Sequence, residues 1–80
     1  MDKKIKILIS TVSDINNFLI ATKGFESDID LIYGRYKIDG KSTLGVYSLD
    51  LSKPIHVEIL SDNEEEIKRF NEVMGAFKVD

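Results

Sequence analysis

The chain has 80 residues and a formal net charge of −3, so we expect one small domain with a single core. Its 11 basic residues are scattered along the chain, which argues against nucleic-acid binding, and the absence of cysteine excludes disulfides, zinc-thiolate sites and thiol nucleophiles. No apolar run resembles a signal peptide or a membrane span. We therefore expect a cytoplasmic protein without membrane insertion.

The N-terminal part of the chain predicts a strand followed by a helix. Residues 4–9 alternate between polar and apolar, which is the pattern of a half-buried strand. Its inward residues are Ile5, Ile7 and Ile9. Thr11 and Asp14 are a candidate capping pair for the following helix, and Ser13 is an alternative N-cap. Gly24 suits the end of that helix. Its apolar stripe consists of Ile15, Phe18, Leu19 and Thr22.

The middle of the chain predicts a β-hairpin and a short helix. Residues 28–33 and 36–38 alternate on either side of Gly34 and Arg35, which indicates two antiparallel strands joined by a tight turn. The residues expected on the inner face of the first strand are Ile29, Leu31 and Tyr33. Residues 42–51 are predicted to form a helix. Its residues at helical spacing are Leu44, Tyr47, Ser48 and Leu51.

The last part of the chain predicts another strand and another helix. Pro54 precedes residues 55–59, which alternate again. Their inward residues are Ile55, Val57 and Ile59. Residues 61–64 supply the start of a final helix. Its apolar face is expected to contain Ile67, Phe70, Met74 and Phe77. Residues 64–66 are three glutamates that suit the positive end of the helix dipole, and we expect a solvated first turn with no further role.

These elements give the order β-α-β-β-α-β-α in a single domain, residues 1–80. Every strand has one apolar and one polar face. This pattern favours an antiparallel sheet with helices on one side only, because a sheet covered on both faces would be apolar on both. The predicted fold class is α+β, an open-faced sandwich of two layers.

One short motif has an obvious interpretation that its spacing argues against. Residues 40–43, GKST, match the end of a nucleotide-binding P-loop, but that motif requires a second glycine five positions before Gly40, where Arg35 stands. No apolar strand of the kind that a nucleotide-hydrolysing fold buries lies directly before it. The sequence also has one histidine among scattered carboxylates, which is no convincing metal set.

The same segment has a second, more specific match. Residues 41–49, KSTLGVYSL, fit the pattern K-S-x-[LM]-G-x-x-S-L, and the order of elements agrees with it over nearly the whole chain. In both respects the sequence resembles the HPr family, the small phosphocarriers of the bacterial sugar phosphotransferase system. The resemblance implies a sheet of order 1-4-2-3 under three helices. It further implies a bacterial carrier or regulatory protein that is not an enzyme and uses no cofactor.

The sequence departs from that family at the phosphorylation site. On the resemblance, the family's phosphorylated histidine falls on Thr11, its arginine on Ser13 and its proline on Asp14. A threonine cannot form the labile P–N bond of a phosphohistidine, and a serine cannot bind phosphate bidentately as a guanidinium does. Asp14 adds a negative charge where the helix N-terminus would hold the phosphate. We therefore expect no catalytic residue and no histidine-based phosphoryl transfer here.

The resemblance leaves two further sites to consider. In Firmicute members the serine at the place of Ser42 is phosphorylated by HPr kinase as a regulatory switch; alternatively, Ser42 only caps a helix. His56, the one histidine, is either an exposed strand residue or a relocated phosphoryl acceptor.

The family also docks protein partners through its first two helices. The corresponding residues here are Val12, Asn16, Lys41, Thr43, Leu44 and Tyr47. An apolar and an aromatic side chain beside a lysine would make a small interface centre. Alternatively, Leu44 and Tyr47 pack inward onto the sheet as an ordinary amphipathic stripe.

Overall fold

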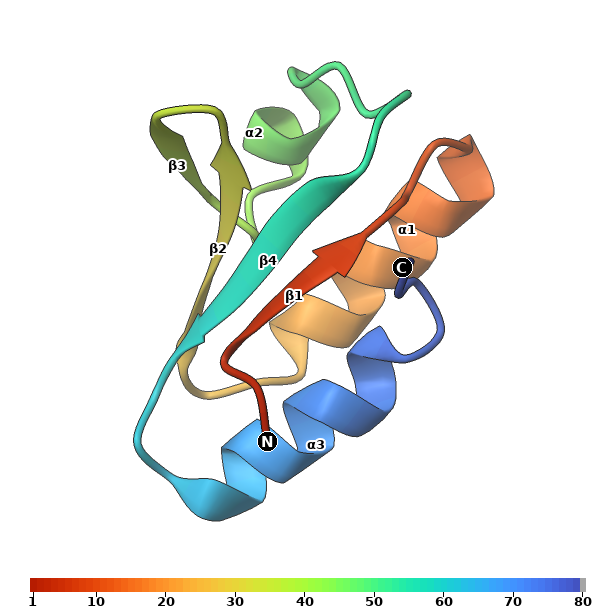
Figure 1. Cartoon of the computed structure of the whole chain (residues 1–80). Coiled ribbons are helices and arrows are strands. Elements are labelled where there is room, and N and C mark those ends of the chain that lie inside the picture. Colours follow the sequence, from red (N-terminus) through yellow and green to blue (C-terminus); the bar gives the residue numbers. More distant parts are fainter. Residues whose placement is uncertain (80) are drawn as a thin grey trace.

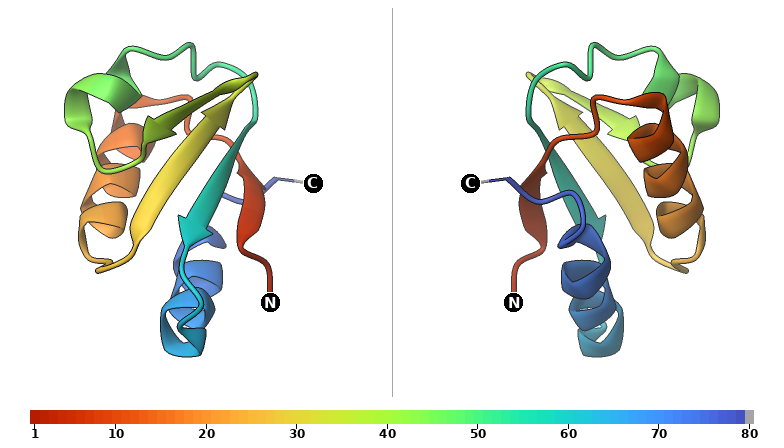
Figure 2. Two further views of the ribbon diagram at one scale, coloured as in Figure 1. Left: turned by 90° about the vertical axis from the view of Figure 1, so that its left-hand side faces the viewer. Right: turned by 90° about the vertical axis from the view of Figure 1, so that its right-hand side faces the viewer.

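The computed structural model describes residues 1–79, which form two layers (Figure 1). The elements are β1 (Lys4–Ile7), α1 (Val12–Lys23), β2 (Asp28–Tyr33), β3 (Tyr36–Asp39), α2 (Thr43–Tyr47), β4 (Ile55–Leu60) and α3 (Glu64–Met74). The strands form one antiparallel sheet in the order β1-β4-β2-β3. The helices gather on one side of the twisted sheet (Figure 2). The predicted fold class, element order and sheet order are confirmed.

The core lies between the sheet and the helices. Alternation places every second residue of the strands toward the helices, and the inward residues of β1, β2 and β4 are buried. The predicted stripes of α1 and α3 supply the other half: Ile15, Phe18, Leu19, Thr22, Ile67, Phe70 and Met74. Two edge-to-face aromatic pairs join helices and loops, Phe18 with Phe77 and Phe25 with Phe70.

The hairpin turn lies at Gly34 and Arg35, as the sequence predicts. Gly34 has φ of +60°, while no other residue among 1–79 has a positive φ, so Arg35 does not. A positive φ at the first central residue alone is the pattern of a type II′ turn, which matches the twist of the flanking strands. Tyr33 lies next to this turn at the end of β2 and is 38% exposed, so it leaves the buried row that Ile29 and Leu31 form.

The ends of β1 and α3 differ from the sequence prediction, whereas the predicted N-cap of α1 is confirmed. β1 ends at Ile7, although Ile9 is buried beyond it as expected. Thr11 is the N-cap of α1, because its Oγ1 accepts the N–H of Asp14 at 3.0 Å; the alternative cap at Ser13 is wrong. Phe77 lies after the end of α3 and packs against the core from the C-terminal segment.

The largest difference concerns α2. It covers five residues instead of residues 42–51, and its buried side chain is Val46, which has no exposed surface, while Leu51 is buried from the following loop. Gly45 explains how the helix packs: a Cβ there would lie 3.1 Å from Ile38 Cγ2 and from Ser42 Oγ. The missing side chain lets α2 approach β3 closely, which leaves Leu44 facing solvent.

Candidate functional site

The structure brings the first two helices together as the sequence predicts. The hydroxyl of Tyr47 donates to Oδ1 of Asn16 at 2.5 Å, and Nζ of Lys23 donates to Oγ1 of Thr43 at 3.1 Å. One bond links the start of α1 to the end of α2, and the other links the end of α1 to the start of α2. The two helices therefore present one continuous surface.

Large apolar side chains on this surface are exposed. Leu44 is 83% exposed, Val12 66% and Tyr47 42%. The alternative in which Leu44 and Tyr47 pack inward onto the sheet is therefore wrong. Val46 takes the inward position on α2 instead.

The sequence interpretation missed one residue of this surface. Ile20 is 72% exposed and lies one turn after Asn16 on α1. Its i+8 spacing from Val12 was the available signal, since residues at i, i+4 and i+8 follow one side of a helix. We define the α1/α2 face as Val12, Asn16, Ile20, Thr43, Leu44 and Tyr47.

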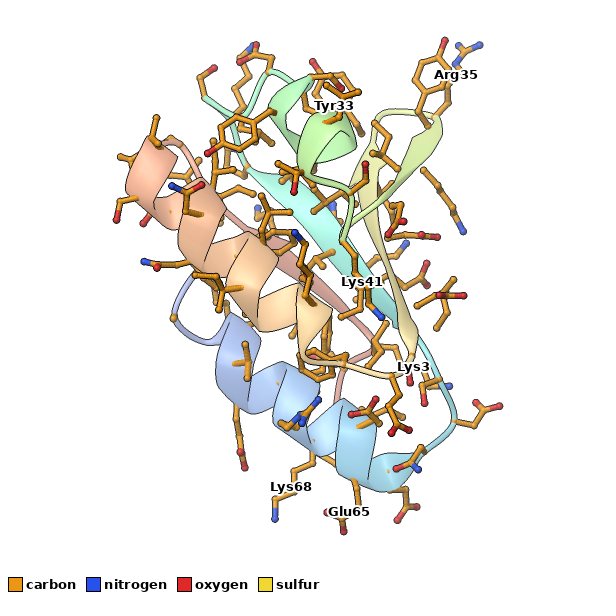
Figure 3. All side chains as sticks on the ribbon, turned by 180° about the vertical axis from the view of Figure 1, so that it is seen from behind. Lys3, Tyr33, Arg35, Lys41, Glu65 and Lys68 are labelled. Atoms are coloured by element: carbon orange, nitrogen blue, oxygen red, sulfur yellow. The ribbon has the colours of Figure 1, made fainter. Side chains whose placement is uncertain are left out.

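Lys41 has a different environment from the other predicted docking residues. Its Nζ donates to the carbonyl oxygen of Phe25 at 2.6 Å in a half-buried position (Figure 3). The hydroxyl of Thr22 donates to the carbonyl of Gly40 at 2.8 Å. These two bonds tie the segment before α2 to the end of α1 and the loop after it. The ammonium of Lys41 thus holds the scaffold beneath the face.

Ser42 occupies the N-cap position of α2. Its Oγ accepts the N–H of Gly45 at 3.1 Å, and its side chain is half-buried. This geometry satisfies one of the donors that a helix start leaves unpaired.

The start of α1 is capped by Thr11 and carries an acidic residue in its first turn. Oγ1 of Thr11 is bonded to the N–H of Asp14, and the one charged residue in the first turn is acidic. An anion there would meet the Asp14 carboxylate instead of a cation. The hydroxyl at position 11 is thus a helix cap.

His56 lies on the polar face of the sheet, as predicted. It is exposed on β4, with Lys6 of β1 and Ile32 of β2 as its cross-strand neighbours. Its neighbours on β4, Ile55 and Val57, point into the core. The imidazole therefore lies on the open face of the sheet, and the α1/α2 face lies in the helix layer.

Glu66 corrects the expectation of a merely solvated first turn in α3. Its carboxylate accepts the N–H groups of Glu26 and Ser27 at 3.0 and 3.2 Å. Arg69 pairs with it at 3.1 Å and lies 4.2 Å from the centre of the Phe25 ring. Desolvation alone would raise the pKa of Glu66, but the hydrogen bonds from Ser27 and Glu26 and the charge of Arg69 outweigh it, so this pKa lies below its usual value.

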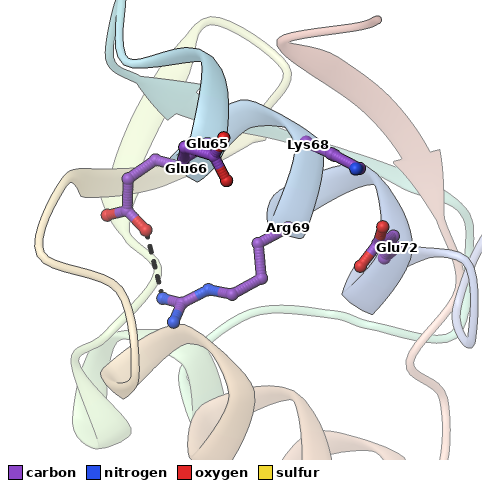
Figure 4. A pocket seen from close by; sticks show the side chains of 5 residues that line it. All are labelled: Glu65, Glu66, Lys68, Arg69 and Glu72. Atoms are coloured by element: carbon purple, nitrogen blue, oxygen red, sulfur yellow. Dashed lines mark ion pairs between the residues drawn. The ribbon is translucent and has the colours of Figure 1, made fainter.

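A shallow hollow on α3 is lined by Glu66 and Arg69 together with Glu65, Lys68 and Glu72 (Figure 4). The hollow contains the ion pair of Glu66 and Arg69, and the guanidinium also donates to the carbonyl of Gly24. The Glu66 and Arg69 side chains are therefore occupied in holding the loop between α1 and β2. We interpret it as a structural clamp.

Residues 1–79 give no sign of two other kinds of site. Within them, no three histidine, aspartate or glutamate side chains are grouped as a metal ion would require. In the same residues, no helix has the length and apolar character to cross a membrane.

Comparison with known proteins defines the fold. No family model and no curated protein sequence matches the chain. Among solved structures, the crystal structure of HPr-C-His from Thermoanaerobacter tengcongensis superposes with a TM-score of 0.71. The alignment covers 94% of this chain and 93% of that chain at 23% identity. The chain has the HPr fold. This likeness extends to the arrangement of sheet and helices.

Proposed function

We propose that this HPr-like protein is a protein-binding or regulatory module that does not transfer phosphoryl groups through histidine. It binds its partner through the α1/α2 face. The observation that carries the proposal is Leu44, which is 83% exposed on a helix anchored from behind by the buried Val46. Contiguous exposed apolar side chains mark protein interaction sites, and Leu44 shares this face with Val12, Ile20 and Tyr47.

The energetics support this use of the face. Complete burial of a leucine contributes about 1.5–3 kcal/mol, and Val12, Ile20 and Tyr47 extend the apolar area around it. The hydrogen bond between Tyr47 and Asn16 fixes the aromatic ring before a partner arrives. A preformed surface loses little conformational entropy on binding. The expected partner is a protein with a complementary apolar patch.

Substitution of Leu44 tests the docking proposal. A cell extract from the source organism is passed over the wild-type protein and over a Leu44→Asp variant, and the retained proteins are identified. Leu60→Asp is the matched control, because Leu60 is 48% exposed on the open face of the sheet. We expect a protein that binds the wild type and the Leu60 variant and is lost with the Leu44 variant. Equal retention by all three would reject this face.

The case against histidine-based transfer rests on the start of α1. Thr11 is bonded as a helix cap, Asp14 supplies a carboxylate, and the sequence has no histidine before position 56. An alternative carrier would use His56. Incubation with phosphoenolpyruvate and the first enzyme of the phosphotransferase system would then give an acid-labile phosphate that His56→Ala removes. We expect no such label.

Ser42 is the proposed regulatory residue of the α1/α2 face. A phosphate on its Oγ would add about two negative charges and replace the cap bond to Gly45, directly before Thr43 and Leu44. Docking would then depend on its phosphorylation. Incubation with HPr kinase and ATP tests this, with Ser42→Ala as the negative control and Ser48→Ala as the matched one. Label retained in Ser42→Ala, or absent from the wild type, would eliminate the switch but leave the docking proposal intact.

A further inference from the structure

The two edge strands of the sheet, β1 and β3, differ in whether another segment pairs with their outer side. The edge at β1 is covered by the C-terminal segment: Leu8 N–H donates to the Phe77 carbonyl and Val79 N–H to the Lys6 carbonyl, both at 3.0 Å. A bridge between Ile7 and Lys78 accompanies these bonds. No segment within residues 1–79 pairs with the outer side of β3. Figure 2 shows β3 as the outermost strand, with α2 in the helix layer beside it.

The hairpin geometry determines which backbone groups of β3 are available. Residues flanking a two-residue turn exchange hydrogen bonds, and every second residue along the strands repeats this. The backbone N–H and C=O of Ile38 therefore point toward β2. Gly40 continues this alternation, because its N–H donates to the Ile29 carbonyl at 2.7 Å. The N–H groups of Lys37 and Asp39 point outward, and neither has a hydrogen-bond acceptor within residues 1–79.

The open face of the sheet has unbalanced charge at this edge. The register places Glu58, Asp30 and Asp39 opposite one another on β4, β2 and β3. Like charges directly opposite each other destabilise a sheet. Lys37 reaches only the inner end of this row, where its Nζ lies 3.6 Å from Glu58. Asp39 ends the row, with one carboxylate oxygen bonded to the N–H of Lys41, and no cationic group of residues 1–79 lies within 4 Å of that carboxylate.

We infer that the β3 edge pairs antiparallel with the β3 edge of a second copy of this chain. A two-fold axis at Ile38 sets Lys37 of each copy opposite Asp39 of the other, on the same face of the joined sheet. The outward N–H of Asp39 then meets the Lys37 carbonyl of the other copy. The outward N–H of Lys37 meets the Asp39 carbonyl, which already accepts the N–H of Ser42 at 3.1 Å and takes a second bond through its other lone pair. The half-buried Ile38 lies opposite its own equivalent. A register centred on Lys37 would set two lysines opposite each other, which is unfavourable.

This association is independent of the α1/α2 face and of its proposed function. The pairing uses one strand of four residues, so the contact is small and the dimer is expected to be weak. Sedimentation of the wild type up to about 1 mM measures it. We expect the weight-average mass to rise with concentration from 9.1 kDa toward twice that value. A mass that stays monomeric throughout would overturn the inference.

A charge exchange tests the register. Lys37→Asp alone places two carboxylates opposite each other, and Asp39→Lys alone places two ammonium groups opposite each other, so each variant should associate about tenfold more weakly than the wild type. An equimolar mixture of the two variants restores opposite charges and should associate again as a heterodimer. A dimer that both single variants retain would place the contact on another surface.

Amide exchange of the wild type provides a readout that does not depend on variant folding. The N–H groups of Lys37 and Asp39 should exchange rapidly with solvent in dilute solution and become protected as the concentration rises. The N–H of Ile38 should be protected at every concentration, because it is bonded to β2. Exchange of Lys37 and Asp39 that does not change with concentration would contradict strand pairing, whatever the oligomeric state.

Discussion

Single carboxylates in this protein act in opposite directions on stability. Glu66 gains hydrogen bonds from a loop that lies 39 and 40 residues away in the chain, and its pKa is lowered. Asp30 lies in a row of acidic residues on the open face, and its pKa is raised, first by partial burial and then by the neighbouring carboxylates, against the opposing charge of Lys37. The ionised form is favoured by folding at Glu66 and disfavoured at Asp30.

The Glu66 carboxylate is expected to stabilise the folded state at neutral pH. Because its folded pKa lies below the unfolded value, this stabilisation is present above the unfolded pKa and is lost as the pH falls through the folded one. Glu66→Gln should lower the midpoint of thermal unfolding at pH 7 and flatten its acid dependence. Glu65→Gln, in the same helical turn but exposed, is the matched control. Equal midpoints for the two variants would contradict the clamp.

For Asp30 we predict that ionisation has the opposite effect on the stability of the fold. A raised folded pKa means that its ionisation destabilises the fold, and that this cost disappears as the pH falls through the folded pKa. Asp30→Asn should therefore raise the free energy of unfolding at pH 7, by a few tenths of a kcal/mol after solvent screening. Urea unfolding at pH 7 and at pH 3 measures this, and the gain should vanish at the lower pH. A loss of stability at pH 7 would show that the acidic row is not strained.

At the scale of elements, α2 divides its residues between the core and the surface for which we propose a role in recognition. Val46 has no exposed surface and fixes the helix on the core, while Leu44 points away from it. Gly45 permits the contact with Ile38 that sets this orientation. The helix is thus held rigidly although it has only five residues.

Two substitutions separate these roles. Val46→Ala should lower the free energy of unfolding by about 2 kcal/mol, because it removes buried methyl groups and leaves a cavity. Leu44→Ala should change it by less than about 0.5 kcal/mol. Chemical denaturation compares the two directly. A large loss of stability with Leu44→Ala would mean that this side chain supports the fold, and the docking proposal would lose its main observation.

The elements differ in how well the sequence predicts them. The alternation of Ile55, Val57 and Ile59 identifies β4 without ambiguity, because an apolar residue at every second position is the pattern of a strand with one buried face. A helix of five residues offers less than two turns of pattern, so periodicity could not choose between Val46 and Leu44 as the buried residue. Nothing local in the sequence connects Glu66 to its distant loop.

At the scale of the whole molecule, the HPr fold is present, and we propose that it works without the chemistry of a phosphohistidine relay. The sheet order and the helix layer were predictable because strand faces and turn residues all agree with one topology. The candidate site was predictable only in part, since the resemblance pointed to the first two helices but not to Ile20 or to the inward role of Lys41. What the fold retains is a rigid pair of helices with an exposed apolar centre.

The central claim is that this scaffold binds partners without carrying phosphate. It is tested most directly by incubating the protein with phosphoenolpyruvate and the first enzyme of the phosphotransferase system, beside an authentic HPr as positive control, and weighing both by intact-protein mass spectrometry under conditions that preserve phosphohistidine. The account predicts one added phosphoryl group on the control and an unchanged mass for this protein. A phosphoryl group on this chain that passes onward to a second carrier would contradict it.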